Sequence, residues 1–281
     1  MDAYTFKIGT MDCVAVSDGD TDYDATDYVV NAPPDEVADA LKAHGHQPDR
    51  IPSPYSGLVI RTDSNLVLID TGAGDMTPNV GKLNGNLRRA GIEPSEIDVV
   101  VLTHGHPDHI GGNVDADGHL AFPNARYVMF RNEWDYWTDE AILAGLAPFF
   151  GQWARANLLP LGDQVELLGG ETEIVPGILA IDAAGHTAGH MAVAIRSGSE
   201  ELLYLSDAAM HPIHLEHPGW YPVWDYDPGA AVATKRRLFD RAASDRSLVL
   251  AFHFPPFPSL GHVTKRGSVW RWEPLAAAVR A

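Results

Sequence analysis

The feature that most constrains this chain is a run of six residues, H-G-H-P-D-H, at positions 104–109. It brings three imidazoles and one carboxylate together directly after a largely apolar stretch at residues 97–102. A buried strand that ends in a polar loop with Gly and Pro is typical of a rigid scaffold that presents ligands to a cleft. The pattern therefore predicts a metal site at the end of a strand.

Composition limits the partners that this chain can have. Its 281 residues, 45% of them hydrophobic, can bury a sizeable core, and 20 Lys+Arg against 38 Asp+Glu give a formal net charge of -18. This charge repels phosphate backbones and anionic membranes. We therefore expect neither nucleic acid nor a membrane as a partner.

Sulfur ligands are nearly absent, because Cys13 is the single cysteine of the chain. One cysteine excludes an intramolecular disulfide and a cysteine-rich zinc site, so a metal must be held by His and carboxylate side chains. Residues 1–7 contain no basic segment followed by a long apolar one, and no later stretch has the length of a membrane-spanning helix. We expect a cytoplasmic protein.

Predicted strands and helices alternate along the chain, which favours one domain over residues 1–281 with helices flanking sheets. Four β-type runs between residues 164 and 206 predict a second sheet. An aromatic-rich helical stretch at about 132–158 is open to three interpretations: a lid over a cleft, a dimer interface or simple core. The other elements are expected as strands at 6–17, 57–61, 65–69, 97–102, 124–130 and 248–252, and as helices at 79–90 and 228–241.

Three later residues repeat the placement of a polar ligand after a strand: His186, Asp207 and His253. With the D-T-G at 70–72 and the glycines at 111–112, these motifs make the chain similar to the metallo-β-lactamase superfamily. The resemblance covers essentially the whole chain. It implies an αββα sandwich, in which two mixed β-sheets are flanked by helices.

The resemblance also implies a dinuclear metal centre. Two divalent ions are expected, with Zn²⁺ first and Mn²⁺ or Fe²⁺ as alternatives. The nucleophile would be a hydroxide that bridges the ions, and Asp108, or a water that it orients, would return a proton to the leaving group. One ion is assigned to His104, His106 and His186, the other to Asp108, His109 and His253, and Asp207 bridges them.

Other polar residues near the motifs have less certain roles. We expect Asp70 to accept an imidazole N–H from a ligand, since ligating histidines usually donate their second nitrogen to such a group; a plain turn is the alternative. Five histidines stay open between cleft-facing and structural roles: His190, His211, His214, His217 and His262.

Segments 228–240 and 252–263 resemble the branch that contains methyl parathion hydrolases and lactonase-like enzymes. This implies a hydrolase for a small, uncharged ester-type substrate: a lactone, an aryl ester or a phosphotriester. Six aromatic residues are candidates for an apolar pocket wall, with core packing as the alternative: Trp220, Tyr221, Trp224, Tyr226, Phe254 and Phe257.

Departures from the sequence patterns of related enzymes narrow the choice of activity. Acyl-homoserine lactonases that resemble this chain usually carry Tyr three positions after the bridging Asp, where this chain has Met210, which disfavours that activity unless Tyr221 or Tyr226 takes the role. A penicillin-type β-lactamase is disfavoured because Cys13 lies far from the motifs.

Two other functional classes and the oligomeric state stay open. An iron-dependent dioxygenase is an alternative on the same fold, although His106 argues against the flavodiiron type. A non-catalytic scaffold protein is disfavoured because all seven ligands are present. Whether the chain forms a homodimer is open.

Overall fold

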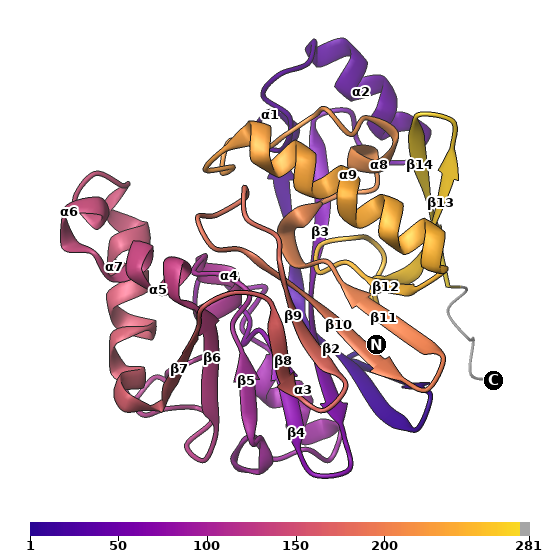
Figure 1. Cartoon of the computed structure of the whole chain (residues 1–281). Coiled ribbons are helices and arrows are strands. Elements are labelled where there is room, and N and C mark those ends of the chain that lie inside the picture. Colours follow the sequence, from indigo (N-terminus) through magenta and orange to yellow (C-terminus); the bar gives the residue numbers. More distant parts are fainter. Residues whose placement is uncertain (276–281) are drawn as a thin grey trace.

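The computed structural model describes residues 1–275 and contains two mixed β-sheets packed face to face with helices outside them (Figure 1). The predicted fold class, an αββα sandwich, is confirmed. The domain predicted over residues 1–281 includes 276–281, which lie outside the described residues. Within residues 1–275, no helix combines the length and apolar character needed to cross a membrane.

The first sheet is antiparallel from β1 to β4 and parallel from β4 to β7. Its strands lie side by side in chain order: β1 (Ala3–Ile8), β2 (Met11–Asp24), β3 (Arg50–Arg61), β4 (Leu66–Ile69), β5 (Val99–Val101), β6 (Arg126–Phe130) and β7 (Val165–Leu168).

The second sheet is antiparallel except where β11 and β12 run in parallel. Its strands are also adjacent in chain order: β8 (Thr172–Val175), β9 (Ile178–Asp182), β10 (Met191–Ser197), β11 (Glu200–Tyr204), β12 (Leu248–Leu250), β13 (Leu260–Arg266) and β14 (Val269–Pro274).

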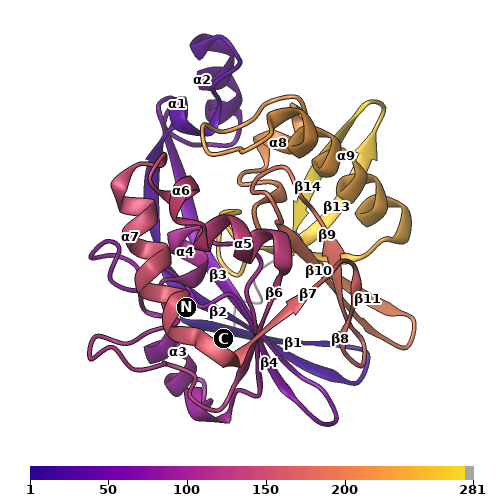
Figure 2. The ribbon, with the colours of Figure 1, turned by 60° about the vertical axis from the view of Figure 1, so that its left-hand side comes forward.

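Helices cover the outer faces of both sheets, and Figure 2 shows α7 and α9 on opposite outer sides of the molecule. The α-helices are α1 (Ala25–Tyr28), α2 (Pro34–Ala43), α3 (Leu83–Arg89), α4 (Pro107–Ile110), α5 (Arg131–Thr138), α6 (Glu140–Leu143), α7 (Pro148–Asn157), α8 (Ile213–Glu216) and α9 (Pro228–Asp245). Within residues 1–275, the short 3₁₀ helices are η1 (Pro94–Glu96), η2 (Leu159–Gln164) and η3 (Ser206–Ala208).

Successive side chains of a strand point to opposite faces of its sheet, and this alternation explains the apolar layers on both faces of each sheet. In β5, Val99 and Val101 face the core between the sheets, whereas Val100 packs in the cluster under the helices of the first sheet. In β10, Val193 belongs to the central core and Ala194 to the cluster under α9. Because both faces of these strands are covered, the sequence contains continuous apolar runs.

Three predicted elements differ from the structure. The strand predicted at 6–17 is a hairpin of β1 and β2, because Gly9 adopts a positive φ of 53° and turns the chain. The run 165–168 was assigned to the second sheet but forms β7 of the first sheet, since the helical crossover from β6 returns the chain beside it in parallel. The helical stretch 132–158 is divided into α5, α6 and α7, where Asp139 caps α6 and Pro148 begins α7.

The carboxyl ends of the parallel strands place the predicted ligands together. Residues 104–109 follow β5, which pairs in parallel with β4, while Asp207 and His253 follow the parallel strands β11 and β12. Two non-glycine residues at these ends have a positive φ, Asp70 at 59° and Ser206 at 46°. Strained backbone of this kind is often retained at functional sites.

The glycines at 111–112 let the loop after β4 lie against α4. A Cβ atom at Gly112 would lie 2.0 Å from the carbonyl oxygen of Thr71, and one at Gly111 would lie 2.5 Å from the backbone of Ala73. No real Cβ contact is that short, so neither position has room for a side chain. The D-T-G loop and the histidine motif are thus held together by direct backbone contact.

We expect Gly112→Ala to lower the free energy of unfolding by about 1–3 kcal/mol, because the added methyl group must displace backbone. Thermal and urea unfolding measure the change. Gly219→Ala is the matched control, since a Cβ at Gly219 meets nothing within 4 Å. Equal stability of the two variants would contradict the close packing.

Candidate metal centre

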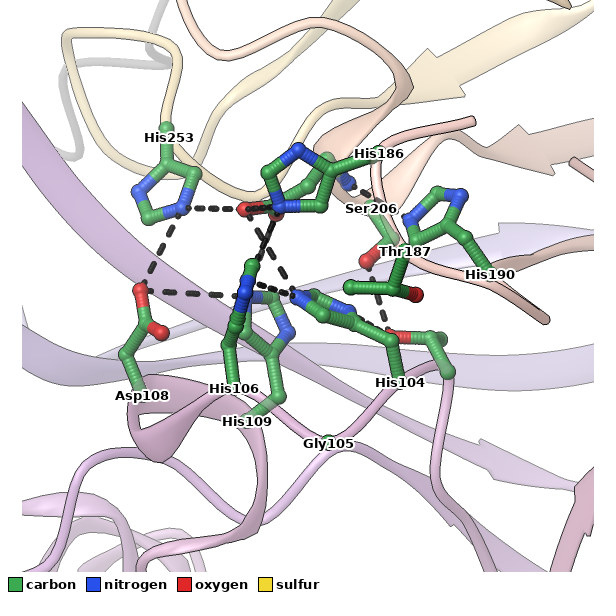
Figure 3. A network of polar contacts seen from close by, with 12 residues as sticks. His104, Gly105, His106, Asp108, His109, His186, Thr187, His190, Ser206 and His253 are labelled. Carbon is green, nitrogen blue, oxygen red and sulfur yellow. Dashed lines mark hydrogen bonds and ion pairs between the residues drawn. The ribbon is translucent and has the colours of Figure 1, made fainter. Parts of the chain in front are cut away.

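The seven predicted ligands converge between the two sheets, near the carboxyl ends of strands from both of them (Figure 3). The loop after β5 supplies His104 and His106, and α4 supplies Asp108 and His109. The second sheet contributes the other three from separate loops: His186 after β9, Asp207 in η3 after β11, and His253 after β12.

The first group of donors contains three imidazoles and one carboxylate. His106 Nδ1 lies 3.0 Å from both His104 Nε2 and His186 Nε2. Asp207 Oδ2 lies 3.4 Å from His186 Nε2 and 3.9 Å from His104 Nε2. We call this group the first site.

The second group contains two imidazoles and two carboxylates, and it shares Asp207 with the first. Asp108 Oδ2 lies 3.7 Å from His109 Nε2 and 3.5 Å from His253 Nε2. Asp207 lies 3.1 Å from His109 through Oδ1 and 3.2 Å from His253 through Oδ2. We call this group the second site.

These spacings fit a divalent cation in each group. Ligand atoms about 2.0–2.2 Å from a tetrahedral zinc ion lie roughly 3.3–3.6 Å from one another, and the donor separations here scatter around that range. His109 Nε2 and Asp207 Oδ1 are buried and make no hydrogen bond with the described residues. Buried polar atoms without partners are costly, and a cation between them would remove that cost.

The outward nitrogens of four ligands are held by neighbouring oxygens. His109 Nδ1 lies 2.9 Å from Asp70 Oδ2, as the sequence led us to expect. The others lie 2.7 Å from Asp225 Oδ1 (His186), 2.7 Å from Ser53 Oγ (His253) and 3.1 Å from Thr103 Oγ1 (His104). These contacts orient each ring so that its other nitrogen points to the centre.

Burial and neighbouring charges shift the pKa of the donors in different directions. Burial alone would lower the pKa of His109, but the carboxylates of Asp207, Asp108 and Asp70 raise it well above the usual range. Burial lowers the pKa of His104 and His106 well below the usual range, and the surrounding imidazoles lower the pKa further, so both rings are neutral at physiological pH. Burial alone would raise the pKa of Asp207, but His253 and His109 hold it well below the usual range. Neutral imidazoles and ionised carboxylates are the forms that bind metal ions.

Sequence analysis missed four residues that support the ligands: Ser53, Thr103, Asp225 and Glu133. Ser53 and His253 are 200 positions apart, and neither belongs to a local pattern that predicts the contact. Asp225 lies in a loop among the aromatic residues considered for a pocket wall, where its carboxylate gave no separate signal.

The remaining histidines lie outside both donor groups. His190 Nε2 accepts from the backbone N–H of Asp207 at 3.1 Å, so this ring supports the shared ligand. His214 is buried within α8 and His211 is buried just before it, and the ring of His217 stacks on Trp220. His262 Nδ1 lies 3.1 Å from the carbonyl oxygen of Ser247.

A cavity of about 230 Å³ adjoins the first site through His106 and His186. Two of the six predicted wall residues, Trp224 and Tyr226, line it, whereas Trp220, Phe254 and Phe257 pack in hydrophobic clusters and Tyr221 does not line it. Helices α5 and α7 and the loop before α7 supply further walls: Tyr136, Trp137, Leu146 and Phe150. The helical stretch thus contributes to the cavity; its role as a lid stays a prediction.

Met210, which stands where related lactonases carry Tyr, is buried in the cluster of Tyr28, Ile213 and Trp220. Its backbone N–H faces His214 Nδ1 at 3.4 Å. Of the two tyrosines considered as substitutes, Tyr226 lies at the cavity.

Comparisons with known proteins agree with this geometry. The chain is 24% identical to the N-acyl homoserine lactonase AiiA of Bacillus thuringiensis subsp. kurstaki over 216 residues, which cover 69% of this chain and 79% of that protein. It is 31% identical to a probable metallo-hydrolase of Mycobacterium tuberculosis over 182 residues, 55% of this chain and 56% of that one.

Solved structures show the same fold. AidC, a dizinc quorum-quenching lactonase, has a TM-score of 0.88 at 25% identity, with 98% of this chain and 97% of AidC covered. The hydrolase AbOPH also has a TM-score of 0.88, at 24% identity over 98% of each chain. A sequence profile described as "Metallo-beta-lactamase superfamily" matches residues 50–253, well over half of this chain. The chain therefore belongs to the metallo-β-lactamase superfamily, as the resemblance of its motifs together implied.

Proposed function

We propose that this protein is a dinuclear zinc hydrolase that opens an uncharged cyclic ester, a lactone. The observation that carries the proposal is the pair of donor groups joined by Asp207 beside an aromatic cavity. The similarity to N-acyl homoserine lactonases and to AidC favours a lactone over the aryl esters and phosphotriesters that the sequence also suggested.

Zinc suits the donor set. Five imidazoles and two carboxylates, without sulfur, form a donor set that zinc binds well, and manganese or iron are alternatives for the same positions. His104, His106 and His186 would hold one ion, and Asp108, His109 and His253 the other. Asp207 would bridge them, because its two oxygens face donors of both groups.

The ions, when bound, would polarise the substrate carbonyl and lower the pKa of a water molecule. The protein's own residues supply binding and proton transfer. Asp108 faces His109 and His253 with Oδ2, so its Oδ1 can hold a proton and release it to the leaving oxygen. Its side chain is 12% exposed against 2% for Asp207, which gives Asp108 the better access to substrate.

The cavity favours an uncharged, partly apolar substrate. None of its lining residues is Lys, Arg, Asp or Glu, and most are aromatic or aliphatic. At about 30 Å³ for each water-sized group, 230 Å³ holds roughly eight such groups, enough for a short acyl chain or one aromatic ring. The hydroxyls of Tyr136 and Tyr226 are available to orient a polar group of that substrate.

We expect Asp207→Ala to remove at least one bound metal ion and to reduce turnover at least about a thousandfold, because each group loses its shared ligand. Mass spectrometry of metal content and hydrolysis assays measure both effects. Asp63→Ala, in the exposed turn after β3, is the control. Two retained ions with full activity would refute the bridging role.

A substrate panel tests the bond that is cleaved. We expect the zinc form to hydrolyse acyl-substituted lactones faster than aryl esters or phosphotriesters, and to leave anionic β-lactams intact because the cavity has no cationic side chain. Manganese and iron forms are assayed beside it. Oxygen consumption by an iron form without lactone hydrolysis would instead support a dioxygenase.

We expect Trp224→Ala to raise KM for an acyl-substituted lactone about tenfold with a smaller change in kcat, since the indole contributes apolar binding surface rather than chemistry. The unsubstituted lactone ring is the internal control, and its kinetics should change little. An equal loss for both substrates would place the acyl group elsewhere.

A further inference from the structure

Glu133 is a buried carboxylate outside the two donor groups. It lies in α5, and none of its surface is exposed. Four groups donate to it: the backbone N–H of Gly105 (2.9 Å) and the indole N–H of Trp137 (2.7 Å) to Oε1, and the hydroxyl of Thr187 (2.8 Å) and the backbone N–H of Gly189 (2.6 Å) to Oε2.

Three of these donors, those of Gly105, Thr187 and Gly189, come from the two loops that carry the imidazoles of the first site, whereas Trp137 belongs to α5 itself. Gly105 stands between His104 and His106, and Thr187 directly follows His186. Figure 3 shows Gly105 and Thr187 beside the histidines of the centre. One carboxylate therefore links a loop of the first sheet to a loop of the second.

Two glycines allow these loops to close on α5. A Cβ atom at Gly105 would lie 2.3 Å from the ring of Trp137, and one at Gly189 would lie 2.6 Å from the backbone nitrogen of Glu133. The loops and the helix are in direct contact, so a shift of the carboxylate must be passed to the ligand loops.

The second site is held by different residues. Asp70 orients His109 and Ser53 orients His253, and neither contact involves Glu133. A change at Glu133 should therefore act on one site more than on the other.

We propose that Glu133 is a positioning residue that sets the metal affinity of the first site by holding the loops of His104, His106 and His186 at a fixed separation. The proposal rests on the dinuclear centre put forward above. It goes beyond it by assigning separate control of the two ions, with α5 as the element through which the cavity wall and the first site are connected.

Glu133→Gln tests this role without a change in size. An amide has one acceptor oxygen, so in either orientation its NH₂ group faces a backbone N–H, that of Gly105 or that of Gly189. We expect metal affinity at the first site to fall about 10–100-fold and affinity at the second to change less than about threefold. Chelator competition with Zn²⁺ and absorption titration with Co²⁺ measure the two binding steps, one for each ion.

Three further variants make the result specific. His186→Ala identifies the binding step of the first site, and Asp135→Asn, exposed on the same helix, is the matched loss of one charge. Trp137→Phe removes one donor but keeps an aromatic ring, and it serves if Glu133→Gln does not fold; it should weaken the first site by a smaller factor.

The outcomes separate the two proposals. Unchanged affinity, or equal weakening at both sites, would overturn the role of Glu133, because a general loss of structure acts on both ions alike. A wild-type protein that binds only one ion would contradict the proposed dinuclear function itself. If no substrate of the panel is hydrolysed, the proposed activity is contradicted, but the metal affinities that test Glu133 still stand as measured.

Discussion

The shared carboxylate of Asp207 makes one centre from ligands that belong to two sheets. Its Oδ1 faces His109 of the first sheet's helix α4, and its Oδ2 faces His186 and His253 from the second sheet. A carboxylate is only about 2 Å across, so the two sheets must meet with little freedom. The apolar core between the sheets supplies that rigidity over a wide area.

Thr103 fixes the same junction at closer range. Its hydroxyl lies 2.8 Å from Ser206 Oγ and 2.9 Å from Asp70 Oδ2, and its carbonyl oxygen accepts from the N–H of Met191 in β10. It therefore joins the ends of β4, β5 and β11 immediately before the first ligand. Glu133 makes a similar connection on the side of the cavity. Two hydrogen-bonded polar residues, Thr103 and Glu133, thus lie on either side of the donor groups.

The ligands could be predicted because each is a polar residue that follows an apolar strand. In addition, the motif at 104–109 contains four of them within six residues. Among the supporting residues, Asp70 could also be predicted, from its D-T-G motif, whereas Ser53, Asp225 and Glu133 could not, since they reach the site only through tertiary contacts. For the same reason Trp224 and Phe254, both aromatic candidates for the pocket wall, separate into a cavity wall and a core position. The sheet that β7 joins likewise depends on the path of α5, α6 and α7 rather than on its own four residues.

The positive φ angles of Asp70 and Ser206 have a consequence for the life of the chain in a cell. Each costs of order 1–3 kcal/mol, and the buried His109 Nε2 and Asp207 Oδ1, which make no hydrogen bond with the described residues, add a further cost. Under the proposed function, ion binding would offset these costs, because a ligand that binds only the native state stabilises it by mass action. The abundance of the folded protein would then follow the supply of divalent metal, because molecules without metal unfold more often and are removed by proteases.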